Sequence, residues 1–76
     1  MGRYEQAEQI LKECIARNPN LAMAYNNLAV TYQETGRFEE AIPLLEQAIR
    51  LDPNMAQARL GLKNVYQKLG RLKDTQ

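Results

Sequence analysis

Residue types that commonly perform chemistry in proteins are scarce in this chain of 76 residues. It has no histidine and one cysteine, Cys14, so a Ser/His/Asp set and an internal disulfide cannot be assembled, and one cysteine cannot supply a zinc site by itself. The adjacent carboxylates Glu39 and Glu40 have no pocket that would raise a pKa, and the isolated glycines form no phosphate-binding loop. We therefore expect no catalytic residue, no cofactor and no metal, and we expect the protein not to be an enzyme.

The overall composition is typical of a soluble globular protein. It is 45% hydrophobic and 25% charged with a net charge of +1, and it lacks the basic stripe that nucleic-acid binding requires. No apolar run approaches the roughly 18 residues that span a bilayer, and the first residues lack the apolar region of a signal peptide. These features predict a cytoplasmic protein that binds neither nucleic acid nor membrane.

The sequence repeats itself with a period of 34 residues, as the equal spacing of Gly2, Gly36 and Gly70 illustrates. Aligning the chain with itself at this offset compares 42 residue pairs, of which 15 are identical. Ordinary composition would give about three identical pairs by chance. A period of this length is typical of a stacked array in which each unit buries only part of its apolar face. Such arrays usually act through their surfaces and seldom through catalysis.

Apolar residues at helical spacing predict four helices. The first and third are expected to end at Pro19 and Pro53, and the second and fourth at Gly36 and Gly70, because proline and glycine both stop helices. Asn and Asp beside the prolines are expected to cap the helices that follow. Short links of this kind place neighbouring helices in antiparallel hairpins. Pro43 is predicted to lie near the end of the first turn of the third helix, where backbone N–H groups have no intrahelical partner.

Individual side chains carry further expectations. Cys14 is predicted to be a small buried thiol, and Glu46 is predicted to pair with Arg50 one helical turn later. Three tyrosines are expected in the core with their hydroxyl groups at its rim: Tyr25, Tyr32 and Tyr66.

The residues of the 34-residue unit follow a known pattern. The first helix of the unit carries Tyr25, Leu28, Ala29 and Tyr32, and the second half carries Gly36, Phe38, Ala41, Leu45, Ala48 and the link Asp52-Pro53-Asn54. This pattern resembles a complete tetratricopeptide repeat. The resemblance implies an all-α fold of antiparallel helical hairpins, stacked as a short right-handed solenoid of four helices. Arg59 replaces the large apolar residue of the pattern, so we expect the fourth helix to be partly solvent-facing, as a cap is.

The phase of the resemblance divides a single domain, residues 1–76, into four parts. Residues 2–21 are similar to the second helix of a repeat and its link, 22–55 to a complete repeat, and 56–70 to the first helix of the next, while 71–76 are expected to be a frayed tail.

The resemblance also implies a concave groove, lined by the first helices of successive repeats, that binds peptides. The candidate residues are Met23, Asn26, Asn27, Val30, Gln33 and Glu34 from the second helix, and Gln57, Leu60, Gly61, Asn64, Gln67 and Lys68 from the fourth. The alternative is an ordinary solvated face. A groove is favoured because Asn26 and Asn27 lie in mid-helix, although Asn is a middling helix former, and because Val30 and Leu60 are apolar among polar neighbours.

Two known grooves of this family match the sequence poorly. The groove that clamps the terminal carboxylate of heat-shock chaperones shares Asn27, but Gln57 and Gly61 stand where it has Lys and Arg. The asparagine ladder of the nucleocytoplasmic sugar-transferring enzymes is similar to residues 25–29, but Gly61 interrupts it.

Two functions follow from these patterns. The first is a protein–protein interaction module that binds a peptide or helix of a partner in the groove. The alternative is a structural, self-associating fragment that oligomerises through uncovered end helices, where Ile10, Ile15 and Leu69 are apolar.

Overall fold

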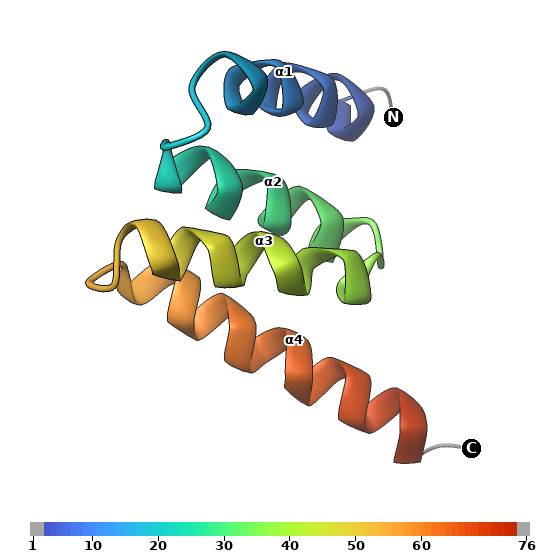
Figure 1. Cartoon of the computed structure of the whole chain (residues 1–76). Helices are drawn as coiled ribbons and strands as arrows, with labels where there is room; N and C mark the ends of the chain where they lie inside the picture. Colours follow the sequence, from blue (N-terminus) through green and yellow to red (C-terminus); the bar gives the residue numbers. More distant parts are fainter. Residues whose placement is uncertain (1–2, 75–76) are drawn as a thin grey trace.

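The computed structural model describes residues 3–74, with the side chains of residues 3–70. Four α-helices follow one another: α1 (Arg3–Arg17), α2 (Ala22–Glu34), α3 (Phe38–Leu51) and α4 (Ala56–Asp74). They lie in a row in chain order, with α1 and α4 at opposite ends (Figure 1). The most extensive contact joins α2 to α3, and α2 also touches α4. The predicted all-α fold of antiparallel hairpins is confirmed, and no strand occurs in the described range.

The core lies between α2, α3 and α4. Its largest fully buried side chains are Leu45 of α3 and Val65 of α4. Alanines allow the helix axes to approach closely around them. The buried cluster comprises Leu28, Ala29, Tyr32, Ala41, Leu45, Ala48, Ala58 and Val65. No residue of α1 is buried, because α1 packs on α2 from one side only. The predicted buried thiol of Cys14 is accordingly only half-buried.

Pro43 lies deeper in its helix than expected. Since α3 begins at Phe38, Pro43 is past the first turn and inside the helix. Its missing N–H leaves the carbonyl of Glu39 without the usual partner four residues on. Both residues are exposed, so water can hydrate that carbonyl and the helix continues.

The links between helices are stabilised in two ways. Gly36 ends α2 as predicted, and its φ of +81° is the left-handed conformation that glycine commonly adopts after a helix. The carboxamide of Asn18 and the carboxylate of Asp52 each accept a hydrogen bond from the backbone N–H two residues later, at 3.4 and 3.2 Å. These two side chains therefore stabilise the turns between helices. The residue at the N-cap of α2 is Leu21, whose side chain forms no capping hydrogen bond. The prediction of an Asn cap on α2 was therefore wrong.

The fourth helix continues past Gly70, where we expected it to end. Gly36 is the only glycine with positive φ in the described part of the chain, so Gly70 keeps a helical backbone and α4 runs on to Asp74. Residues 71–74 of the expected frayed tail are thus helical, while residues 1–2 and 75–76 lie outside the described residues. No described helix is long and apolar enough to cross a membrane.

The tyrosines differ in burial according to what packs on each helix. Tyr32 is 6% exposed, as predicted, and half-buried Tyr25 donates its hydroxyl hydrogen to the carbonyl of Pro19 at 3.0 Å. Tyr66 is 50% exposed, contrary to the prediction, because no described helix packs on that side of α4. Arg59 is exposed, as expected.

The predicted pair of Glu46 and Arg50 does not form. Arg50 instead donates to the carboxamide of Gln47, one turn earlier, at 3.2 Å.

Candidate functional site

A cleft of about 390 Å³ lies between α2 and α4, and we call it the α2/α4 cleft. On each helix the lining positions recur every three or four residues, which places them on one face. The cleft is lined by Asn26, Asn27, Val30 and Gln33 of α2 and by Gln57, Leu60, Gly61 and Asn64 of α4. All eight are among the residues that the sequence suggested for a groove. The structure therefore brings most of the candidate set together.

Gly61 allows α4 to approach the other two helices closely at the cleft. A Cβ atom at this position would lie 3.2 Å from Cδ2 of Leu45 and 3.5 Å from Nε2 of Gln33. Leu45 is fully buried and has little room to move. The absence of a side chain at residue 61 thus shapes the cleft.

The lining of the α2/α4 cleft is polar and uncharged. Five of its side chains are carboxamides, each with two N–H donors and one carbonyl acceptor. Asn26 is only 6% exposed, and its side chain makes no hydrogen bond to the described residues. In the described part of the chain, every fully buried side-chain nitrogen or oxygen atom has a hydrogen-bond partner. The residual exposure of Asn26 is therefore at its amide. Val30 and Leu60, 40% and 59% exposed, add an apolar side chain from each wall.

Four other candidates lie outside the α2/α4 cleft. Met23 and Lys68 are exposed on its two helices but do not line it. Glu34 accepts a hydrogen bond from the hydroxyl of Tyr4 at 2.6 Å, which ties it to α1 and raises the pKa of Tyr4. Gln67 belongs to a second cleft, described below.

A charged network joins α1 to the link after α2. Arg37 bonds the carboxylates of Glu8 and Glu40, both at 2.8 Å, and its guanidinium lies 4.1 Å from the ring centre of Tyr32. The pKa of Glu8 is lowered most by its hydrogen bond with Lys12 and next by its hydrogen bond with Arg37. The pKa of Glu40 is lowered mainly by its hydrogen bond with Arg37. The sequence analysis missed this network.

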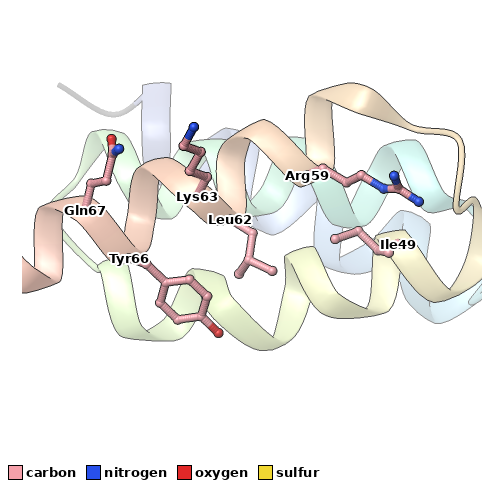
Figure 2. Close-up of a pocket in the computed structure, with 6 residues that line it drawn as sticks. All are labelled: Ile49, Arg59, Leu62, Lys63, Tyr66 and Gln67. Carbon is pink, nitrogen blue, oxygen red and sulfur yellow. The ribbon is translucent and has the colours of Figure 1, made fainter.

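The second cleft, which we call the α3/α4 cleft, has a volume of about 580 Å³. Leu62 and Tyr66 extend from α4 towards α3, while Arg59 reaches towards Ile49 (Figure 2). Lys63 and Gln67 complete the lining on the other side of α4 (Figure 2). The sequence named Arg59 as a departure from the repeat pattern, Tyr66 as a core residue and Gln67 as a groove candidate, but it did not predict a cleft here. Neither cleft has a metal-binding set, since no group of three or more His, Cys, Asp or Glu residues within the described range could hold an ion.

Comparison with known families bears on what these clefts do. Residues 1–54 match a family model described as tetratricopeptide repeat. The chain belongs to the tetratricopeptide repeat family. No curated protein matches it. Tetratricopeptide repeats generally mediate protein–protein interactions and are typically not catalytic. The match includes α1, α2 and α3, while the division into one complete and two half repeats stays a prediction.

Proposed function

We propose that this tetratricopeptide repeat chain binds an extended peptide segment of a partner protein in the α2/α4 cleft. The observation that carries the proposal is the convergence of eight groove candidates from two helices on one cleft. A cleft of about 390 Å³ has the dimensions of a site for a few residues of a ligand.

Carboxamides suit the backbone of an extended peptide, because they can both donate to its carbonyls and accept from its N–H groups. Such a backbone presents equivalent groups on one side about every 6.7 Å, and a helix advances about 5.4 Å per turn. On each helix the lining amides are about two turns apart, Asn27 and Gln33 on α2 and Gln57 and Asn64 on α4, so they suit backbone groups about three residues apart on an extended ligand. The amide of Asn26, which keeps a little exposure at the cleft and has no partner among the described residues, would gain a hydrogen bond from such a ligand.

The lining residues other than the carboxamides indicate which kind of ligand side chain the cleft favours. Val30 and Leu60 offer exposed apolar surface on opposite walls, which favours an apolar ligand side chain between them. No lysine or arginine lines this cleft, and Lys68 lies outside it. A ligand held by a terminal carboxylate is therefore disfavoured.

Peptide selection followed by affinity measurement tests the proposal. Peptides selected from a displayed random library on the wild-type protein would be measured by titration calorimetry against the double variant Asn27→Ala/Val30→Ala. We expect at least about tenfold weaker binding, or a loss of about 1.4 kcal/mol. The matched control is Met23→Ala, because Met23 is 49% exposed on the same helix but outside the cleft. Unchanged affinity in the double variant would show that the groove assignment is wrong.

Self-association through the end helices is the second candidate. It is favoured by Ile10 of α1, 59% exposed, and Tyr66 of α4, 50% exposed. Ile15 and Leu69, also named for this role, pack partly against the core. Sedimentation over a wide concentration range separates the two candidates, since a strict monomer at high concentration excludes the second. A cytoplasmic location stays a prediction under either.

A further inference from the structure

Charge is distributed unevenly along the chain. The sequence of α4 contains five basic residues and one acidic residue, a net charge of +4, whereas the rest of the chain has five basic and eight acidic residues, a net charge of −3. The total of +1 conceals this difference. One end of the row of helices is therefore basic.

The α3/α4 cleft lies at this basic end and combines apolar with basic side chains. Ile49, Leu62 and Tyr66 form its apolar part, Arg59 reaches towards Ile49, and Lys63 extends from the opposite edge of α4, away from α3 (Figure 2). Neither Arg59 nor Lys63 forms a salt bridge with any residue that the structure describes. That includes Glu46, which lies one turn before Ile49 on α3, and Asp52, which directly follows α3. The two cations are therefore available to a partner.

The α1 helix of a second copy of this chain would not pack well on α4 in the way that α3 packs on α2. Residues 59 and 63 of α4 correspond, at the 34-residue offset, to Tyr25 and Ala29 of α2. Ala29 is fully buried in the core that α2 shares with α3. An α1 helix stacked on α4 in the same manner would place Lys63 where Ala29 is fully buried, and an ammonium group is costly to desolvate there even beside a carboxylate.

We propose that the α3/α4 cleft binds an amphipathic helix of a partner protein, in which an apolar stripe is flanked by glutamates or aspartates. The lining residues of α4, from Arg59 to Gln67, extend about 12 Å along the helix axis, enough for two turns of a docked helix. The apolar stripe contacts Ile49, Leu62 and Tyr66, and the carboxylates pair with Arg59 and Lys63. This surface is separate from the α2/α4 cleft, so a protein could occupy one cleft while a peptide occupies the other.

Designed helical peptides of about four turns, roughly 15 residues, provide the probes. One carries a leucine stripe flanked by glutamates, and the second has lysines in place of the glutamates. Both would be titrated by calorimetry at low and at physiological salt against the wild type, the double variant Arg59→Glu/Lys63→Glu and Tyr66→Ala. The matched controls are Lys68→Glu and Leu60→Ala, a cation and an apolar residue of α4 outside this cleft. All five substituted residues are exposed, and circular dichroism checks that each variant is folded.

The proposal expects the glutamate peptide to bind at least about tenfold more tightly than the lysine peptide at low salt, with a smaller ratio at physiological salt because ions screen the charges. The double charge reversal and Tyr66→Ala are each expected to weaken binding of the glutamate peptide several-fold, and the controls to change it less than twofold. Equal affinity for the two peptides, or equal losses in the controls, would overturn the proposal. So would a dimer in sedimentation that Tyr66→Ala abolishes, which would assign the cleft to a second copy. Tighter binding of a DNA duplex than of the glutamate peptide, lost on charge reversal, would also contradict it.

Discussion

Glu8 of α1 accepts a hydrogen bond from Arg37, which follows α2, at 2.8 Å, although 29 residues separate them in the chain. Arg37 also bonds Glu40 of α3, so one guanidinium connects the first helix with the third. Because α1 has no buried residue, its position depends more on polar contacts of this kind than the positions of the core helices do. The pair joins the Tyr4–Glu34 hydrogen bond and the partly buried Leu11 and Ile15 in placing α1.

Glu8→Gln is expected to loosen α1 without unfolding the remaining helices. The substitution removes the charge that holds Arg37 and Lys12 while keeping the length of the side chain. Hydrogen exchange should accelerate in the backbone amides of α1 and change little in α3. Glu5→Gln is the control, since Glu5 lies exposed on the same helix and forms no salt bridge with a described residue. Equal acceleration in α1 and α3 would mean that the pair does not act locally.

Acid is expected to remove the stabilisation that this network supplies. The pKa values of Glu8 and Glu40 lie below their ordinary value of 4.5, so both carboxylates favour the folded state above that pH. The contribution is lost as the pH falls through the lowered pKa values. Thermal unfolding of the wild type and of Glu8→Gln/Glu40→Gln should therefore differ at pH 7 and converge as the solution is acidified. A difference that stays constant with pH would rule out this origin.

Three glycines are expected to respond differently to alanine. Gly70→Ala should stabilise the protein by up to about 1 kcal/mol, because Gly70 is helical and a Cβ there meets nothing within 4 Å. Gly36→Ala should destabilise it by about 1–2 kcal/mol, since φ of +81° is unfavourable for alanine. Gly61→Ala should gain nothing, because the contact with buried Leu45 offsets the better helix propensity. Chemical denaturation measures all three, and a gain at Gly61 equal to that at Gly70 would contradict the close approach of α4.

Leu45→Ala should be the most damaging single change tested, at about 2–5 kcal/mol, because it leaves a cavity at a fully buried position in the central helix. Leu60→Ala removes the same atoms from a side chain that is 59% exposed and should change stability by less than about 0.5 kcal/mol. Denaturation curves of the two variants give the comparison directly. Similar losses would indicate that the core is not centred on α3.

Much of the fold was predictable because it depends on local patterns. Apolar spacing and breakers located the helices, and the resemblance to the tetratricopeptide repeat suggested Asn27 and Asn64 as groove residues, which the structure places in the α2/α4 cleft. The pair Glu8–Arg37 was not predictable, because at the 34-residue offset Glu8 corresponds to Ile42 and the repeat gives no sign of it.

Two further errors have a common cause. Gly70 was expected to end α4 and Tyr66 to be buried, since their counterparts Gly36 and Tyr32 behave in this way. Both expectations assume a helix packed on the far side of α4, and the described chain has none. Internal repetition thus predicts local conformation only where the tertiary neighbours are repeated as well.

The central claim is that the α2/α4 cleft binds an extended peptide, and NMR titration of the isotope-labelled protein with a selected peptide tests it most directly. We predict that the largest shifts occur at the side-chain amides of Asn26, Asn27 and Asn64 and at the methyl groups of Val30 and Leu60. Saturable shifts confined to the α3/α4 cleft or to α1, with these amides and methyl groups unmoved, would contradict the claim.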